Sequence, residues 1–122
     1  MATVVALVPD LLFGSRVQGL LAAGGHDATL VADPAAAATA LGAGPVDVLV
    51  VDLVSDVRDG IADTEGLRAD GALDGVAVLG FFAHTAPEVR ERALAAGFDQ
   101  VVPRSRMNRE GAQLVTALAA AG

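Results

Sequence analysis

The stretch from Val46 to Asp52, which reads Val-Asp-Val-Leu-Val-Val-Asp, constrains the fold more than any other part of the chain. It is short, almost continuously apolar and rich in β-branched residues, and it follows the turn-forming pair Gly44-Pro45. Such a run is typical of a strand that is buried on both faces of a parallel sheet. Ligands bind at the carboxyl ends of the strands in open sheets of this kind, so Asp52 lies where a functional site is expected.

Four further apolar runs have the same pattern, and segments with helical spacing separate them. Strands are expected at residues 3–8, 28–31, 46–52, 76–82 and 99–102. Helices are expected at residues 11–23, 34–41, 61–69, 86–96 and 107–120. Regular alternation of strands and helices predicts a three-layer α/β sandwich with parallel strands, formed by residues 1–122 as one domain. Met1 and the alanine-rich end favour a natural stand-alone unit.

Two helix starts have recognisable capping signals. Asp33 precedes Pro34, which is the expected order of an N-cap followed by proline in the first helical turn. Thr85 is followed three residues later by Glu88, and this spacing resembles a capping box with Thr85 as the N-cap.

Composition excludes several classes of function. The net charge is -7 and the eight basic residues are all arginine, which argues against sequence-independent binding to nucleic acid and against chemistry that needs a lysine. Cysteine is absent, so disulfides and thiol catalysis are excluded. The N-terminus lacks the basic region of a signal peptide, and no apolar run approaches the roughly 18 residues that span a membrane. We therefore expect a cytoplasmic protein without membrane contact.

Three motifs together resemble the receiver domain of response regulators, and the resemblance covers the whole chain. Val50-Val51-Asp52 matches the buried third strand that ends in the phosphoaccepting aspartate of that family. Asp59-Gly60 lies at the spacing of the family's Asp-Gly pair, and residues 95–102 are similar to the run that leads into its fifth strand. The resemblance implies a flavodoxin-like (βα)5 fold with strand order 2-1-3-4-5, and it implies Asp52 as the phosphoacceptor.

The metal site of the family is incomplete in this sequence. Receivers bind Mg²⁺ through an acidic pair after the first strand together with the phosphoacceptor, because an incoming phosphoryl group needs a hard cation. Here the pair reads Pro9-Asp10, so one acid is missing. The resemblance therefore implies a weak Mg²⁺ site formed by Asp10, Asp52 and the backbone carbonyl of Val54.

The groups that contact and report the phosphoryl group also differ. By spacing, Phe82 occupies the place of the family's Ser or Thr, and a phenyl ring cannot donate a hydrogen bond. Arg104 occupies the place of the phosphate-pairing Lys, with a planar fork and a different reach. Ser105 replaces the following proline, and Val101 replaces the aromatic switch residue. The family pattern thus keeps the phosphoacceptor and a cation but loses both switch groups.

Alternative interpretations of these residues stay open. Asp52 has either a role with an anion, a metal or a phosphoryl group, or only accepts hydrogen bonds from the next loop. Asp10 either binds a metal or caps the first helix. For Arg104 we favour internal ion pairs with Asp10 and Asp52. His26 is expected at the surface, and His84 lacks neighbours at the spacing of metal ligands.

The resulting hypothesis is a stand-alone, receiver-like signalling domain that acts through protein-protein interaction rather than as an enzyme. Its partner would be a histidine kinase, a downstream effector or a second copy, bound through the fourth helix, fifth strand and fifth helix. The alternative is a phosphorylation-independent pseudo-receiver that serves as a constitutive interaction or dimerisation module. A nucleotide-binding flavodoxin-like protein or small enzyme is disfavoured, because neither a Gly-x-Gly-x-x-Gly motif nor a nucleophile-base pair is present.

Overall fold

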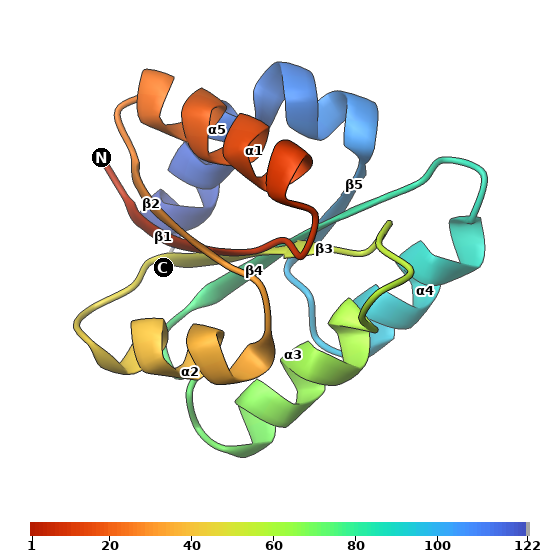
Figure 1. Cartoon of the computed structure of the whole chain (residues 1–122), viewed down its shortest axis with the longest axis horizontal. Helices are drawn as coiled ribbons and strands as arrows, with labels where there is room; N and C mark the ends of the chain where they lie inside the picture. Colours follow the sequence, from red (N-terminus) through yellow and green to blue (C-terminus); the bar gives the residue numbers. More distant parts are fainter. Residues whose placement is uncertain (122) are drawn as a thin grey trace.

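The computed structural model describes residues 1–121, in which five strands alternate with five helices (Figure 1). The strands are β1 (Thr3–Leu7), β2 (Asp27–Val31), β3 (Val48–Asp52), β4 (Ala77–Phe82) and β5 (Gln100–Pro103). The helices are α1 (Leu11–Ala23), α2 (Pro34–Gly42), α3 (Gly60–Ala69), α4 (Pro87–Ala95) and α5 (Arg104–Ala121). The predicted alternation is confirmed, and apart from the start of α5 every boundary agrees within two residues.

The strands form one parallel sheet with the order β2-β1-β3-β4-β5. The predicted fold class and the strand order implied by the resemblance are therefore confirmed. Helices α1 and α5 cover one face of the sheet, and α2, α3 and α4 cover the other, which gives the three layers (Figure 1). β3 lies at the centre, and all five of its residues are buried, as its continuous apolar run predicts.

Two apolar clusters hold the layers together, one on each face of the sheet. Successive side chains of a strand point to opposite faces. Val48 and Val50 of β3 accordingly belong to the cluster that includes residues of α1 and α5. Leu49 and Val51 belong to the cluster that includes residues of α2, α3 and α4. Burial on both faces fixes the register of β3, and with it the place where Asp52 emerges from the sheet.

The capping predictions were correct for α2 and wrong for α4. The Asp33 carboxylate accepts a hydrogen bond of 2.8 Å from the backbone N–H of Ala36, as expected of an N-cap. At α4 the N-cap is Ala86, without a side-chain cap, and not Thr85. Proline disfavours helical geometry in the residue before it, and Ala86 has a non-helical backbone with φ of -128° and ψ of 64°. The helix therefore begins at Pro87, one residue too late for Thr85 to cap it.

Replacing Asp33 and Thr85 by alanine tests which of the two side chains caps a helix. Asp33→Ala is expected to lower the free energy of unfolding by about 1 kcal/mol, because it removes an acceptor for a free helix N–H. Thr85→Ala is expected to change it by no more than about 0.5 kcal/mol, since Thr85 is exposed and makes no capping bond. Urea titration of both variants measures the difference. Equal losses in the two variants would contradict the assigned helix starts.

Helix α5 begins at Arg104, three residues before the predicted start at residue 107. The predicted ranges leave residues 103–106 between the last strand and the last helix, whereas Pro103 is the last residue of β5. β5 lies at the edge of the sheet and pairs only with β4, and an edge strand tolerates a residue without an N–H. α5 is the longest helix, with 18 residues. Within residues 1–121, no helix is both long and apolar enough to cross a lipid bilayer.

His26 is buried, which corrects its predicted position at the surface. Its side chain links the start of β1 to the middle of α5. Nδ1 accepts a hydrogen bond of 3.0 Å from the backbone N–H of Ala2. Nε2 lies 2.9 Å from the carbonyl oxygen of Ala112 and 3.0 Å from the Thr116 hydroxyl. Because Nδ1 acts as an acceptor, the ring proton resides on Nε2 and is donated to α5.

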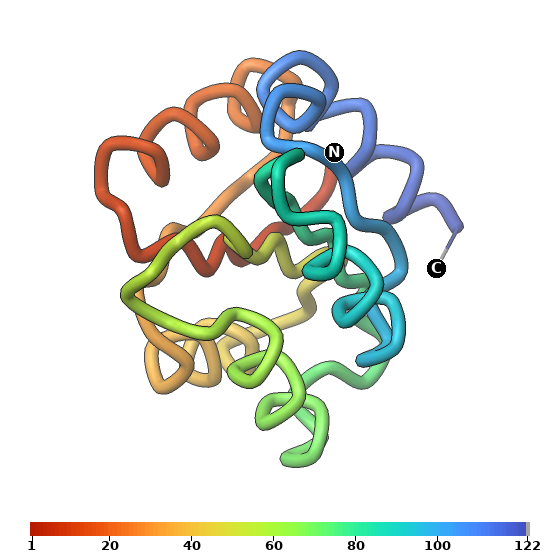
Figure 2. Tube along the Cα trace, turned by 90° about the vertical axis from the view of Figure 1, so that its right-hand side faces the viewer, coloured from red at the N-terminus to blue at the C-terminus, as the bar shows by residue number. Residues whose placement is uncertain are grey.

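The loops that follow β1 and β3 meet at the carboxyl edge of the sheet. Figure 2 shows the red loop after β1 beside the yellow-green loop after β3. The first residue of α5 follows directly after β5, so its side chain reaches the same edge. The topology thereby brings residues from three distant parts of the sequence to one place.

Candidate functional site

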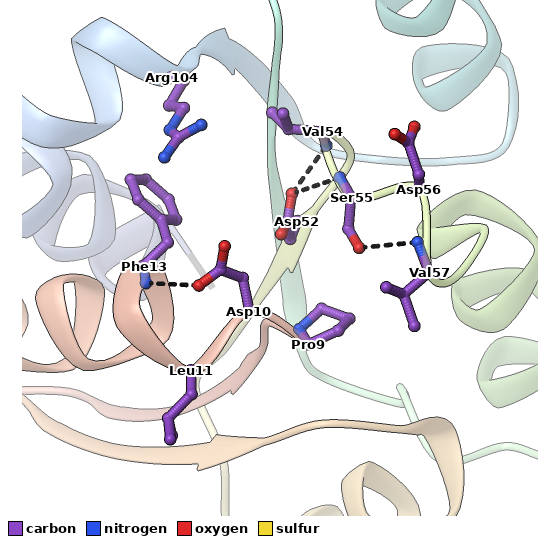
Figure 3. Close-up of a pocket in the computed structure, with 10 residues that line it drawn as sticks. All are labelled: Pro9, Asp10, Leu11, Phe13, Asp52, Val54, Ser55, Asp56, Val57 and Arg104. Atoms are coloured by element: carbon purple, nitrogen blue, oxygen red, sulfur yellow. Dashed lines mark hydrogen bonds between the residues drawn. The ribbon is translucent and has the colours of Figure 1, made fainter.

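A pocket of about 540 Å³ lies where these loops meet (Figure 3). Asp10 and Asp52 enter it from the ends of β1 and β3, and Arg104 enters it from the start of α5. The pocket is lined by Pro9, Asp10, Leu11, Phe13, Asp52, Val54, Ser55, Asp56, Val57 and Arg104. The structure therefore brings together most of the candidate residues named from the sequence, including Val54.

Asp52 is the most buried polar group of the pocket, with 5% of the residue exposed. Its Oδ1 atom accepts hydrogen bonds from the backbone N–H of Val54, at 2.7 Å, and of Ser55, at 3.1 Å. This arrangement is typical of an aspartate that initiates a turn. The second oxygen, Oδ2, has no hydrogen-bond partner among the described residues. One carboxylate oxygen thus anchors the loop, and the other is left for the pocket.

Burial raises the pKa of Asp52 above its ordinary value of 3.8. Loss of hydration is the largest cause, because it penalises the charged form. The backbone N–H groups of Val54 and Ser55 and the charge of Arg104 lower the pKa in part, and the charge of Asp10 raises it further. The folded protein therefore holds the Asp52 proton more tightly than the unfolded chain does.

The raised pKa predicts how Asp52→Asn changes stability with pH. Between 3.8 and the higher pKa of the folded state, the native protein binds more protons, so its stability falls as pH rises through that window. At a pH above the folded-state pKa, the free-energy cost of burying the charged carboxylate is fully present. Asp52→Asn removes this penalty and keeps an oxygen acceptor for the loop, so the variant is expected to be more stable than wild type at pH 7.

Thermal unfolding followed from pH 3 to pH 7 measures this difference. The stability advantage of Asp52→Asn is expected to vanish as pH falls below about 3.8. Asp56→Asn is the control, because Asp56 is an exposed carboxylate of the same pocket, and it is expected to behave like wild type. An Asp52→Asn variant that is less stable than wild type at pH 7 would contradict a net penalty for the buried charge.

Asp10 caps helix α1. Its Oδ1 atom accepts a hydrogen bond of 3.0 Å from the backbone N–H of Phe13. Of the two interpretations of Asp10, the one in which it caps the first helix is therefore correct. Asp10 also lines the pocket, and its other oxygen makes no hydrogen bond within residues 1–121. Capping and a role in the pocket are therefore compatible.

Arg104 lies over an aromatic ring instead of pairing with the aspartates. The guanidinium carbon is 3.9 Å from the centroid of the Phe13 ring, and that ring in turn packs against Phe81 with centroids 5.1 Å apart. None of the ion pairs found between residues 1–121 involves Arg104. The expected ion pairs with Asp10 and Asp52 are thus absent within residues 1–121, and the guanidinium group stacks on Phe13 instead.

Phe82 is placed away from this pocket. Its residue is 5% exposed and packs in the cluster between the sheet and helices α2, α3 and α4, together with Phe98 and Val101. It does not line the pocket of Asp52. In this structure, Phe82 therefore belongs to the core on that face of the sheet and not to the pocket of Asp52.

The donor groups fit a weakly held magnesium ion. Asp10 and Asp52 each use one oxygen for backbone N–H groups and leave the other without a partner in the described part of the chain. Two carboxylates and a backbone carbonyl, completed by water, form the hard-oxygen set that Mg²⁺ prefers. Among residues 1–121, no group of three or more histidine, aspartate or glutamate side chains is placed to hold a metal ion. The set thus lacks the third acid of a strong site.

Sequence reasoning missed the apolar half of the pocket. Phe13 was counted as part of a helix, and Leu11 and Val57 were not named as site residues. Leu11 and Phe13 lie in the first turn of α1, where apolar residues do not differ in pattern from core residues, and Val57 is a single apolar residue in a loop. No signal in the sequence separated them from other apolar residues. Ser55 had a signal, because an aspartate at a strand end often binds backbone N–H groups two and three residues later.

Comparison with known proteins identifies the fold. The sequence matches no protein-family model and no curated protein sequence. Among solved structures, the receiver domain of response regulator 1452 from Francisella aligns with a TM-score of 0.84 and 21% identity, over 99% of this chain and 98% of that one. A putative response regulator from Chloroflexus aurantiacus aligns with a TM-score of 0.85 and 16% identity, over 98% of each chain.

A third structure bears on the metal site. The receiver domain of sensor histidine kinase PA1611 from Pseudomonas aeruginosa aligns with a TM-score of 0.82 and 20% identity, over 98% of each chain. That protein has a magnesium ion coordinated in its active-site cleft. The strand order, the pocket at the carboxyl edge and these alignments agree, and this chain has the fold of response regulator receiver domains over nearly its whole length.

Proposed function

We propose that this chain is a receiver-type signalling domain that acts by binding a protein partner, with Asp52 as its phosphoacceptor. One observation carries the proposal: Asp52 ends the central strand and turns an unpaired carboxylate oxygen into a pocket that also contains Asp10 and Arg104. The receiver fold supports the same assignment. The proposed role is phosphoryl acceptance and binding rather than turnover of a substrate, and the proposed location is the cytoplasm.

The proposed chemistry is a transfer of a phosphoryl group to Oδ2 of Asp52. A lone pair on Oδ2 attacks phosphorus, an O–P bond forms, and the bond between phosphorus and the donor breaks, so that its electron pair leaves with the donor. The attacking group must be the ionised carboxylate. Since burial raises the pKa of Asp52, acidification reduces the fraction that can react. A histidine kinase is the proposed donor protein.

The residues around Asp52 have distinct proposed roles. Asp10, Asp52 and the carbonyl of Val54 would hold Mg²⁺, and the ion would supply positive charge that neutralises the phosphoryl oxygens. Arg104 lines the same pocket and would contact the phosphoryl group as a second cation. The backbone N–H groups of Val54 and Ser55 keep Oδ1 in place and so orient Oδ2.

A phosphorylation-independent module is the second candidate, and a specific observation favours it. Phe82 and Val101, which stand where the family has its switch groups, are both buried in one apolar cluster. Neither side chain can make the hydrogen bond that would draw it toward a phosphoryl group. In this case the surface formed by α4, β5 and α5 would bind an effector or a second copy without a phosphorylation signal.

Modification of Asp52 separates the two candidates. Incubation with a small acyl phosphate and Mg²⁺ is expected to add one phosphoryl group to wild type, detected by intact-mass spectrometry, and none to Asp52→Asn. Asp56→Asn is the matched control and should be modified like wild type, since Asp56 is exposed at the edge of the same pocket. If wild type remains unmodified, or if Asp52→Asn is modified to the same extent as wild type, Asp52 is rejected as the phosphoacceptor.

A further inference from the structure

None of the charged side chains that line the pocket forms an ion pair within residues 1–121. Arg104 is stacked on Phe13 and forms no ion pair or side-chain hydrogen bond within residues 1–121. Only 5% of Asp52 is exposed, and one of its two carboxylate oxygens has no hydrogen-bond partner within residues 1–121. Figure 3 shows Arg104 and Phe13 on one side of the pocket and Asp52 on the other. A cation and an anion therefore line the same pocket.

The rest of the pocket lining includes several apolar side chains. Leu11 is 75% exposed and Val57 is 81% exposed, and both line the pocket. Pro9 and Val54 add to the same lining. Exposed apolar surface that converges on a pocket is a feature of sites for organic ligands, and about 540 Å³ lies within the usual range for such sites.

The balance of charge narrows the class of ligand. Three aspartates and one arginine line the pocket, so its net charge is negative and a simple anion is disfavoured. A simple cation would satisfy Asp52 but leave Arg104 without a partner. A molecule with both a positive and a negative charge can pair with Asp52 and with Arg104. An apolar part of the same molecule can cover Leu11 and Val57.

We propose that this pocket binds a small zwitterion of the amino-acid type with an apolar side chain. Its ammonium group binds Oδ2 of Asp52, its carboxylate binds the guanidinium of Arg104, and its side chain covers Leu11 and Val57. Arg104 needs little reorganisation, because the stack on Phe13 already holds it at the pocket wall. The inference does not rest on phosphoryl acceptance by Asp52, although ligand and phosphoryl group would exclude each other.

Three related probes test each charge separately. L-phenylalanine has both charges, phenethylamine lacks the carboxylate, and hydrocinnamate lacks the ammonium. Binding is followed through the amide NMR signals of Val54 and Ser55, or by calorimetry. L-phenylalanine is expected to bind wild type about tenfold more tightly than either single-charge probe, because each charged hydrogen bond contributes to affinity.

Two variants complete the test. Asp52→Asn is expected to weaken the binding of L-phenylalanine and phenethylamine by about tenfold. The binding of hydrocinnamate is not weakened, because the variant removes a negative charge from a pocket that must hold an anion. Arg104→Gln is expected to weaken the binding of L-phenylalanine and hydrocinnamate by about tenfold. The binding of phenethylamine is not weakened, because the variant removes a positive charge from a pocket that must hold a cation. Arg109→Gln is the matched control, because Arg109 is exposed on the same helix and does not line this pocket. It should change no affinity.

Several outcomes would overturn the proposal. Absence of saturable binding of L-phenylalanine would reject the ligand class. Phenethylamine that binds as tightly as L-phenylalanine would show a site for organic cations only, without a role for Arg104. If either variant lost the same affinity for all three probes, the substitution would have disturbed the pocket in general, and the two charges would not be recognised separately. Phosphorylation of Asp52 is measured independently, so its failure does not affect these results.

Discussion

Gly60→Ala is expected to lower the free energy of unfolding by about 1–3 kcal/mol and to displace the end of β3 at Asp52 together with the loop that follows it. A Cβ atom at Gly60 would lie 2.7 Å from the carbonyl oxygen of Asp52 and 2.8 Å from Cγ1 of Val51. Real Cβ atoms do not approach a backbone oxygen so closely, so either α3 or the end of β3 must shift. Urea titration measures the loss, and the amide signals of Val54 and Ser55 report the displacement.

Gly66→Ala is the matched control on the same helix. Among residues 1–121, no atom outside the helix lies within 4 Å of a Cβ atom at Gly66, which is exposed in the middle of α3. Alanine favours the helix over glycine, so this variant is expected to gain about 0.5–1 kcal/mol. If both variants were stabilised, the close approach of α3 to Asp52 would not exist in solution.

His26→Ala is expected to lower the free energy of unfolding by about 2–4 kcal/mol. The substitution leaves the buried N–H of Ala2 without its acceptor and opens a cavity between β1 and α5. It also removes the contact of Nε2 with the Thr116 hydroxyl. Calorimetry or urea titration measures the loss, and hydrogen exchange should show that residues near the start of β1 open first.

His84→Ala is the natural comparison, because these are the only two histidines of the chain. His84 is exposed in the loop after β4, so its replacement is expected to change stability by no more than about 0.5 kcal/mol. A loss for His26→Ala as small as that for His84→Ala would contradict the buried bridge.

The fold was largely predictable, because its signals are local. Continuous β-branched runs mark buried parallel strands, and Asp33-Pro34 marks a helix start. Each signal depends on residues close together in the sequence. The strand order came from the resemblance to receiver domains, since the runs alone do not say which strands are neighbours. The position of Asp52 at the end of β3 follows from the same local pattern.

The errors concern contacts between distant residues or competition between neighbouring signals. At Thr85 a capping box competed with Pro87, and proline decided where the helix begins. His26 is 86 residues from Ala112, so the sequence pattern did not reveal their contact. Arg104 was assigned to the aspartates by charge, but the ring of Phe13 lies closer. Partner choice in a pocket depends on geometry that composition and spacing do not contain.

The measurement that tests the central claim most directly is an amide NMR spectrum recorded with and without Mg²⁺ and beryllofluoride, which mimics a bound phosphoryl group. It is recorded for wild type and for Asp52→Asn. We predict shifts in wild type only, which spread from Asp10, Asp52 and Arg104 to helices α4 and α5. An unchanged wild-type spectrum at saturating beryllofluoride, or equal shifts in Asp52→Asn, would contradict a receiver that takes its signal at Asp52.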